Sequence, residues 1–410
     1  MPPSHRRVVQ VIGAVACVTF AGCTGGSDRD APPATTPPTS IAPTVERERD
    51  GRLLLGVYLP QTGPGSTLGQ PMIATVQAAV DEINEAGGVL GRDVAVTIQD
   101  EGAPTGPGAL LDQGVDAVIG PASSRNALAH LATLVGETTG VVTCSPAATA
   151  LPLDDYPDNG YFFRTVASDS LQMAAIARRA ERTGAATLGI GYLDDPYGRG
   201  LARSLIDEVA QRRRQLVVDD VAFSPDQEDL SDVVDQLLEG DPGVVVVLGD
   251  ADDGGRLLTA LDTEVPDGTF QVVVNDSIRT AAAIQQLSPG MLDRLTAIAP
   301  VATTEQSPDY FTAQVADCVA LIALATIEAG TDDPSEIRLW MAPVSGGGRQ
   351  CTSFADCLVL QQQGLQIDYN GRSGPIEWSS TSGDPTRATF VQFRFDSSGS
   401  EIDLRTFEVP

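Results

Sequence analysis

The sequence predicts an α/β protein built from two doubly wound, Rossmann-like lobes. Two observations carry this prediction: short strands that are apolar on both faces alternate with amphipathic helices, and the alternation restarts once along the chain. Strands of this kind, separated by helices, form parallel sheets that are covered on both sides. The length of 410 residues also exceeds one ordinary hydrophobic core. We therefore expect two parallel sheets, one in each lobe.

The first series of elements begins at Leu53. Its strands are apolar throughout, and its first helix carries apolar residues at helical spacing before Gly87 and Gly88 supply a left-handed stop. The expected strands are 53–59, 94–98, 115–119 and 141–143, and the expected helices are a short one before Gly114 and the longer runs 72–86 and 124–136.

The second series begins after Tyr161-Phe162-Phe163-Arg164. The expected strands are 187–193, 216–221, 244–248 and 270–274, and the expected helices are 170–182, 198–213, 230–238 and 256–261. Ligands bind to doubly wound sheets outside the carboxyl ends of the strands. Polar residues that directly follow these strands are therefore the candidates for a binding site, and two lobes facing each other would enclose a cleft.

The charged composition excludes several classes of function. The formal net charge is -29, from 55 acidic and 26 basic residues, and every basic residue is arginine. Without lysine there is no Walker-A phosphate loop and no pyridoxal phosphate Schiff base. So acidic a chain is also not expected to bind nucleic acid, which requires basic side chains against the phosphates. Only two histidines occur, which argues against a histidine-based triad or a multi-histidine zinc site.

The N-terminus carries the features of a secretory address. A short basic region precedes an apolar run that is too short to span a bilayer, which needs ~20 residues, but that suits a signal peptide. The run ends in Phe20-Ala21-Gly22-Cys23, which resembles a bacterial lipobox with Phe20 at the usual leucine position. We expect a lipoprotein signal peptide over 1–22, lipidation of Cys23, and a Pro/Thr-rich tether over 23–51. The alternative is an ordinary signal peptide with an incidental cysteine.

Five short sequence motifs follow one another in a recognisable order. They are Gly87-Gly88-Val89-Leu90-Gly91-Arg92, Ile119-Gly120-Pro121-Ala122-Ser123-Ser124, Ser145-Pro146-Ala147-Ala148-Thr149, Tyr161-Phe162-Phe163-Arg164-Thr165 and Asp194-Asp195-Pro196-Tyr197-Gly198-Arg199-Gly200. This series resembles the branched-chain amino-acid (Leu/Ile/Val) binding proteins, which are type I periplasmic substrate-binding proteins of ABC importers. The C-terminal words around Cys351–Cys357 and 368–375 resemble actinobacterial members.

The resemblance implies a domain organisation. Three crossovers would join the lobes, near Thr165, Ile298 and Arg372. The first lobe would contain 52–166 and 299–371, including a long helix over 308–330, and the second lobe would contain 167–298 and 372–410.

The resemblance also implies a cradle for a ligand α-carboxylate. Ser123 and Ser124 stand between a buried strand and a helix start, where free N–H groups and the helix dipole favour an anion. Plain helix capping is the competing interpretation, and both can hold. Backbone groups near Ala147 and the hydroxyl of Thr149 would form the second half of the cradle, unless this segment is a simple turn.

An amino-acid ligand also needs an acceptor for its ammonium group. Asp276 matches the acidic position of the family, and Asp250 is a second candidate, although either could be a solvated loop aspartate. Tyr197 matches an aromatic residue that faces the cleft in the family, with helix-start packing as the alternative. Leu68 and Ala251 stand where the family often has aromatic residues, so the pocket would lose ring surfaces and gain room, and the resemblance does not determine the identity of the ligand.

The remaining cysteines and acidic clusters predict no metal or cofactor. Cys351 and Cys357 are expected to form a disulfide in an oxidising compartment. Cys144 and Cys318 are either free thiols or a second bridge, with free thiols slightly favoured. The acidic run that starts at Asp250 fails the EF-hand pattern.

The sequence thus predicts a non-enzymatic solute-binding lipoprotein on the extracytoplasmic face of the cell membrane. Its expected partners are a small amino-acid-like ligand, the permease of an ABC transporter, and the membrane through its lipid anchor. Hinge closure around the ligand is the expected mechanism. The alternative is a sensor of the same fold that reports to a signalling partner.

Overall fold

The computed structural model describes residues 49–63, 65–136, 140–214, 216–225, 227–280, 282–300, 310–379 and 382–410. The expected signal peptide, the lipidation site Cys23 and most of the tether lie outside the described residues. The residues that the structure describes belong to one compact unit, Thr44–Pro410.

The first sheet is five-stranded and entirely parallel, with the order β2-β1-β3-β4-β5. Its strands in chain order are β1 (Leu54–Leu59), β2 (Ala95–Asp100), β3 (Ala117–Ile119), β4 (Val142–Ser145) and β5 (Phe162–Arg164). The central strands are almost entirely buried, whereas edge strand β2 is only half-buried. This difference is why the central strands read as apolar runs and the edge strand is more polar.

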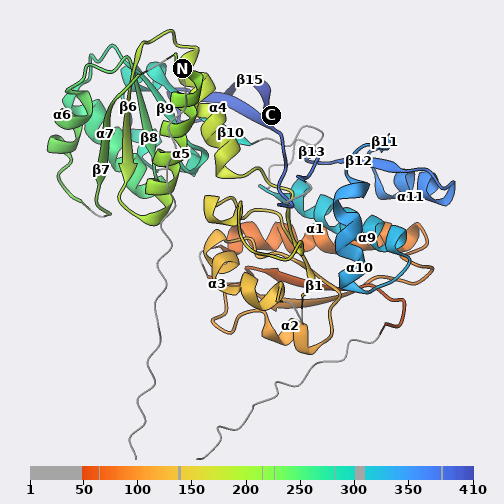
Figure 1. The fold of residues 1–410 in the computed structure, drawn as a ribbon. Helices are drawn as coiled ribbons and strands as arrows, with labels where there is room; N and C mark the ends of the chain where they lie inside the picture. Colours follow the sequence, from red (N-terminus) through yellow and green to blue (C-terminus); the bar gives the residue numbers. More distant parts are fainter. Residues whose placement is uncertain are drawn as a thin grey trace, which may run out of the picture. The chain divides into compact units, whose positions relative to one another are not determined.

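Helices from both ends of the chain cover this sheet. From the N-terminal part come α1 (Ser66–Glu85), α2 (Gly108–Asp112), α3 (Ser124–Leu134) and the 3₁₀ helix η1 (Leu151–Leu153), and from the C-terminal part come α9 (Thr312–Ala329), α10 (Pro334–Val344) and α11 (Phe354–Gln362). Figure 1 shows α9 beside α1, although the two are far apart in sequence.

Helix α9 is the core helix of this lobe. It is long and apolar enough to cross a membrane, with a mean hydropathy of 1.5, but 83% of it is buried inside the protein. It packs against α1, α10, β3 and β4. Its apolar character on all sides is therefore explained by burial within the first core.

The second sheet has seven strands in the order β15-β14-β10-β9-β8-β6-β7. In chain order these are β6 (Thr187–Leu193), β7 (Leu216–Phe223), β8 (Val244–Leu248), β9 (Gln271–Val274), β10 (Leu295–Pro300), β14 (Ala388–Phe395) and β15 (Glu401–Val409). The pairs β10–β14 and β14–β15 are antiparallel and the others are parallel. Alternate residues of β8 belong to two different hydrophobic cores, so this sheet is covered on both faces.

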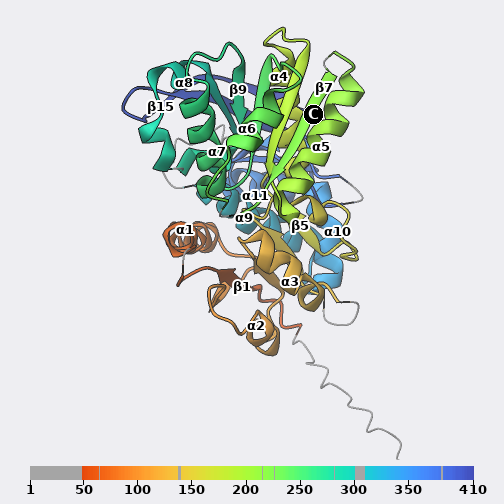
Figure 2. The same cartoon turned by 90° about the vertical axis from the view of Figure 1, so that its left-hand side faces the viewer.

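Helices and 3₁₀ helices flank the second sheet in Figure 2. They are α4 (Asp169–Glu181), α5 (Pro196–Arg212), α6 (Ser231–Leu238), α7 (Ala251–Glu264), η2 (Asp276–Thr280), η3 (Ala282–Gln286) and α8 (Pro289–Arg294). The predicted α/β class with two lobes and parallel sheets is confirmed, with the C-terminal hairpin adding antiparallel strands at one edge.

A third, small sheet joins β11 (Arg349–Cys351), β12 (Ile367–Gly371) and β13 (Gly374–Pro375). Beyond it, Ile376 and Trp378 still belong to the first core, where the ring of Trp378 lies 5.0 Å from that of Phe163. The sequence places the third crossover near Arg372. In the structure the chain keeps its contacts with the first lobe through Trp378 and joins the second sheet at Ala388.

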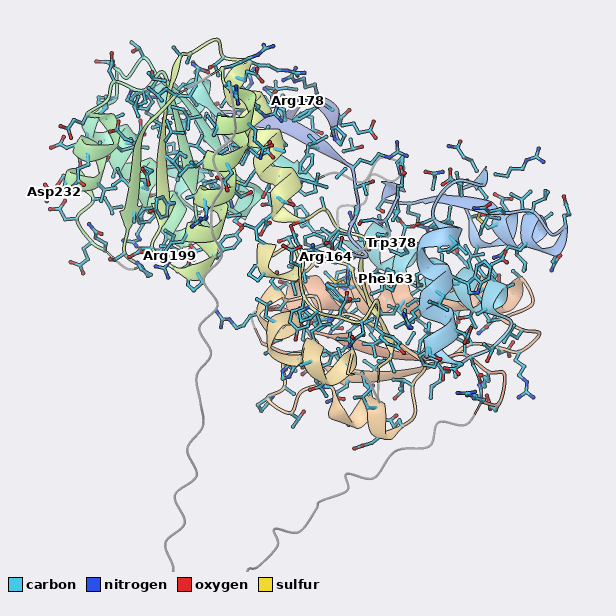
Figure 3. All side chains as sticks on the ribbon, viewed as in Figure 1. Phe163, Arg164, Arg178, Arg199, Asp232 and Trp378 are labelled. Carbon is cyan, nitrogen blue, oxygen red and sulfur yellow. A yellow bond between two sulfur atoms is a disulfide. The ribbon has the colours of Figure 1, made fainter. Side chains whose placement is uncertain are left out.

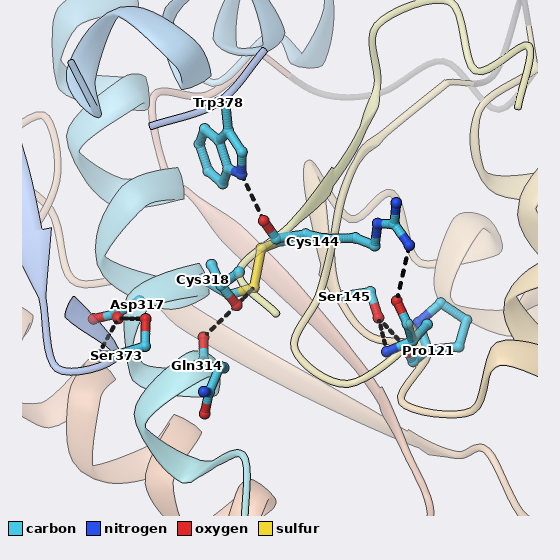
Figure 4. The surroundings of a disulfide bond; sticks show 11 residues. Pro121, Cys144, Ser145, Gln314, Asp317, Cys318, Ser373 and Trp378 are labelled. Carbon is cyan, nitrogen blue, oxygen red and sulfur yellow. Dashed lines mark hydrogen bonds between the residues drawn. A yellow bond between two sulfur atoms is a disulfide. The ribbon is translucent and has the colours of Figure 1, made fainter. Parts of the chain in front are cut away.

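The four cysteines that the structure describes form two disulfides. Cys351 and Cys357 are bridged, and so are Cys144 and Cys318. The preference for free thiols at Cys144 and Cys318 is wrong, because α9 packs directly on β4 and brings their Cα atoms to 5.7 Å, within the usual range for a disulfide. Figure 4 shows this bridge, which immediately precedes Ser145 in the chain.

Candidate functional site

The start of α3 already holds an internal carboxylate. Ser123 caps the helix by accepting a hydrogen bond from the Asn126 amide, as the capping interpretation predicts. The amides of Ala122 and Ser123 both donate to the side chain of Glu101, at 2.8 Å each. Burial raises the pKa of Glu101, while these amides and Asn126 oppose the increase. Two of the N–H groups expected to receive a ligand carboxylate are therefore occupied.

The next residue, Ser124, is arranged differently. Its Oγ accepts hydrogen bonds from the amides of Thr149 and Ala150, at 3.1 and 3.2 Å. Because a hydroxyl has two acceptor lone pairs and one proton, the proton of Ser124 is left to donate to a ligand. The structure thus brings Ser124 and Thr149 together, as the resemblance implies for the two halves of the cradle.

The loop from β4 to η1 is fixed around Ser145. The Ser145 hydroxyl donates to the carbonyl of Pro121 at 2.6 Å and accepts from the amide of Ala148 at 3.0 Å. Among the described residues no hydrogen bond involves the backbone of Ala147, which is only partly buried. This leaves its backbone groups available at the position where the sequence predicts a contact with the ligand head group.

Sequence reasoning missed the most unusual residue of the site, Asp169. It is the first residue of α4, its amide donates to the Thr149 carbonyl at 2.9 Å, and only 4% of it is exposed. Its Oδ2 atom is buried without a hydrogen-bond partner. Burial, reinforced by the charge of Asp276, raises the pKa of Asp169 to about 7. The hydroxyl of Thr149 opposes this shift.

Tyr197 lies at the centre of the polar groups contributed by the second sheet. Its hydroxyl is 3.4 Å from both Ser277 Oγ and Asn275 Nδ2. Burial raises its pKa well above 10, and the charges of Asp169 and Asp276 add to the shift. Tyr197 therefore stays neutral and can donate its proton.

Two further side chains complete this group. Asn275 is fully buried and donates to the Gly249 carbonyl at 3.1 Å, but its Oδ1 has no partner. Gln172 donates from Nε2 to Asp276 Oδ1 at 2.9 Å. Asp276, like Asn275, directly follows β9, so both lie at the carboxyl end of a parallel strand.

Other candidates are not brought to this group. Asp250 is exposed and caps α7, accepting a hydrogen bond from the Asp253 amide at 2.8 Å. Leu68 lies on α1 and is 39% exposed, and Ala251 packs against a core of the second lobe. Among the described residues no group of three His, Cys, Asp or Glu side chains could hold a metal ion.

A buried arginine supports the loop that carries Thr149. Arg164, at the end of β5, pairs through Nη2 with Asp154 and through Nε with Asp384, at 2.6 Å each. Its Nη1 atom points to the carbonyls of Ala148 and Ala150, at 3.4 and 3.5 Å. Figure 3 places Arg164 near Trp378, whose indole donates to the Arg164 carbonyl.

The site is therefore a set of polar groups that follow strand ends in both sheets. They are Ser124 and Thr149 from the first, and Asp169, Tyr197, Asn275 and Asp276 from the second part of the chain. It offers the hydroxyl protons of Ser124 and Tyr197 beside unsatisfied acceptors, and these described residues include no nucleophile–base pair. Such a set can bind a small polar molecule. A polar residue at the start of the helix after β5 is the signal that could have found Asp169.

A comparison with protein-family models shows to which family the chain belongs. The model described as periplasmic binding protein matches residues 53–315. The chain belongs to the periplasmic binding protein family. This is a family of extracytoplasmic binding proteins, not of enzymes, in agreement with the prediction from the sequence.

Several named proteins are similar to the chain. The chemotactic signal transduction system substrate-binding protein BasB of Halobacterium salinarum is 25% identical over 346 residues, covering 79% of this chain and 82% of that protein. The Leu/Ile/Val-binding protein homolog 1 of Brucella melitensis is 24% identical over 310 residues, covering 70% and 81%.

The fold is also shared with solved structures. An ABC transporter substrate-binding protein from Desulfitobacterium hafniense, solved in complex with Leu, matches with a TM-score of 0.65 and 20% identity, covering 86% of this chain and all of that one. At this level of identity, the match supports the fold alone.

Proposed function

We propose that the protein is the solute-binding lipoprotein of an ABC importer and that it binds a small amino acid. One observation carries the ligand class: Asp169 Oδ2 and Asn275 Oδ1 are buried acceptors without donors. Leaving a buried acceptor unpaired costs about 1–3 kcal/mol, and more for a charged one. A ligand ammonium group would satisfy both the charge and the missing hydrogen bond of Asp169.

The other end of the ligand would be a carboxylate. The free proton of Ser124, the hydroxyl of Tyr197 and the backbone at Ala147 are donors of the kind that such a group requires. A Leu/Ile/Val-binding protein of Rhizobium johnstonii and a homologue of such proteins in Brucella melitensis are among the relatives, which supports a branched aliphatic side chain. Ring-free positions at Leu68 and Ala251 are compatible with an aliphatic ligand.

In this proposal the ligand is captured by closure of the two lobes. Contacts from both sheets to one ligand favour the closed state by the difference in binding free energy between the two states. The closed form is then recognised by the permease. Lipidation of Cys23 would keep the protein at the outer face of the membrane, and metabolic palmitate labelling that is lost in Cys23→Ser tests this part.

Calorimetry with three related compounds tests the ligand class. Leucine should bind, whereas N-acetyl-leucine, which lacks the ammonium group, and leucinamide, which lacks the carboxylate, should bind at least tenfold more weakly. Asp169→Asn should abolish binding of leucine, and Asp232→Asn, which removes an exposed aspartate from α6, is the matched control. Equal binding of all three compounds would contradict the proposal, as would the absence of binding across a screen of amino acids.

A signalling role is the second candidate, favoured by the similarity to a chemotactic substrate-binding protein. The two roles differ in whether uptake of the ligand depends on this protein. Loss of radiolabelled leucine uptake in a strain lacking the chain supports import. Normal uptake together with a lost behavioural or transcriptional response to the ligand supports sensing.

A further inference from the structure

A group of arginines lies at the opposite end of α4 from Asp169, where this helix covers the edge of the second sheet. Helix α4 packs against β10, β14 and edge strand β15. Arg178, labelled in Figure 3 beside this edge, donates from Nη1 to the Glu408 carbonyl of β15. The last turn of α4 and the edge of the sheet are therefore in direct contact.

The α4 side of β15 displays arginine, and the acidic residues of that strand face the other way. Phe407 and Val409 pack in the core shared with α4, so Arg405 lies on the same face by strand alternation. Asp403 pairs with Phe393, whose side chain belongs to the opposite core. Glu408 alternates with Phe407 and also points away.

Three guanidinium groups gather on this face, from Arg179 and Arg182 of α4 and Arg405 of β15; we call them the arginine cluster. The guanidinium carbons of Arg182 and Arg405 lie 5.9 and 5.5 Å from the centre of the Phe407 ring. This ring holds both groups through cation–π contacts. The ring also fixes the geometry of the cluster.

Within the described residues, none of the three arginines forms an ion pair. Arg179 donates from Nη2 to Thr296 Oγ1 at 3.2 Å, and Arg405 donates from Nε to Gln392 Oε1 at 2.9 Å. Both partners are neutral. The Nε atom of Arg179 is buried and has no partner. The cluster therefore has a buried N–H donor without an acceptor, and within the described residues no carboxylate pairs with its three positive charges.

The three charges also act on one another. Burial lowers the pKa of Arg179 and the charge of Arg405 lowers it further, and Arg182 has the same effect on the pKa of Arg405 after burial. The helix dipole favours arginines in the last turn of a helix, which explains the presence of Arg179 at the end of α4. It does not explain Arg405, which lies on β15. The chain has 55 acidic and 26 basic residues, yet the charged groups of this cluster are all arginines. A bound anion would neutralise them.

We propose that the arginine cluster binds a phosphate group. Planar guanidinium forks match phosphate oxygens in two-point hydrogen bonds, and two of them over one ring with a third on the same face suit a dianion. The phosphate could belong to an anionic phospholipid headgroup or to a soluble phosphate compound, because the same chemistry recognises both.

The test uses the full chain with Cys23→Ser, so that no lipid anchor contributes to vesicle binding. Inorganic phosphate and pyrophosphate are titrated by calorimetry at low salt. Binding should weaken at least tenfold in Arg179→Gln/Arg405→Gln. The control Arg199→Gln/Arg203→Gln removes the same charge from exposed positions of α5 in the same lobe and should bind like the parent protein.

Vesicle flotation distinguishes the two sources of phosphate. Vesicles of phosphatidylcholine with and without phosphatidylglycerol are compared, with and without competing phosphate. Recruitment only by phosphatidylglycerol, lost in the cluster variant, supports the headgroup, and phosphate binding without recruitment supports a soluble ligand. If neither phosphate nor vesicles bind, or if both double variants lose binding equally, the proposal is overturned. Unchanged leucine binding and thermal unfolding of the cluster variant show that it is folded.

Discussion

Replacing Asp169 with asparagine should stabilise the ligand-free protein while removing its ligand binding. The carboxyl group of Asp169 has a pKa of about 7 instead of its ordinary value of 3.8, a difference of about three pH units. Each unit corresponds to ~1.4 kcal/mol, so the ionised group costs the folded state about 4 kcal/mol at alkaline pH. Asparagine is itself a buried polar group, so we expect a net gain of about 2 kcal/mol.

The gain should depend on pH in a defined direction. The folded pKa of Asp169 lies above the unfolded value, so the native protein loses this part of its stability as the pH rises from about 4 to about 7. The asparagine side chain of the variant does not titrate. The variant should therefore be less stable than the native protein by about 2 kcal/mol near pH 4, where Asp169 is protonated, and more stable by about 2 kcal/mol above pH 7, a total change of about 4 kcal/mol. Carboxyl groups that do not interact with Asp169 titrate alike in both proteins and cancel.

Urea unfolding at pH 4.5 and pH 8, followed by circular dichroism, measures this difference. Asp232→Asn is the control, because an exposed aspartate should change the free energy of unfolding by less than about 0.5 kcal/mol at both pH values. A variant that is less stable than the native protein at pH 8 would refute the reasoning. So would a difference that is the same at both pH values.

Four further outcomes follow from the same structure. A cationic ligand favours ionised Asp169, so leucine binding at pH 6 should release a proton, seen as a buffer-dependent heat in calorimetry, and affinity should rise toward pH 8. Ser124→Ala removes the acceptor of two amides and the donor to the ligand, and should weaken binding at least tenfold while the protein stays folded in circular dichroism. Cys144→Ala with Cys318→Ala opens a bridge between residues 174 apart and should cost about 2–5 kcal/mol in urea unfolding. Asp384→Asn leaves a buried arginine charge partly unpaired and should cost about 3 kcal/mol, measured in the same way.

The α/β class and many of its strands could be predicted from the sequence because apolar runs and helix-capping residues are local signals. The buried strands β1, β3 and β4 of the first sheet were predicted from their apolar runs, and Ser123 was predicted as a helix cap. Strand β5, which is equally buried, was not predicted as a strand. The features that could not be predicted are those that depend on neighbours distant in the sequence. Nothing local to Cys144 shows that α9 packs on its strand, and nothing local to Trp378 shows that its ring reaches Phe163.

The candidate site shows the same division. Ser124, Thr149, Tyr197 and Asp276 follow strand ends, a position that the sequence reveals. Asp250 has that position too, yet its carboxylate is used to cap α7. A residue's place along the sheet edge can be read from the sequence, but not which neighbours already use its hydrogen-bonding capacity. These residues therefore stay predictions until ligand binding is measured.

Three buried carboxylates differ in whether the fold already supplies all their hydrogen-bond donors, and this difference distinguishes a structural carboxylate from a candidate ligand-binding one. Glu101 accepts from two amides and a side chain at the start of α3. Asp317 accepts from the Tyr369 hydroxyl and from backbone and side-chain donors at the third small sheet. Both are satisfied within the fold. Asp169 alone among these three retains a buried oxygen without a donor in the fold, so a ligand that brings a donor to this oxygen gains free energy that Glu101 and Asp317 no longer offer.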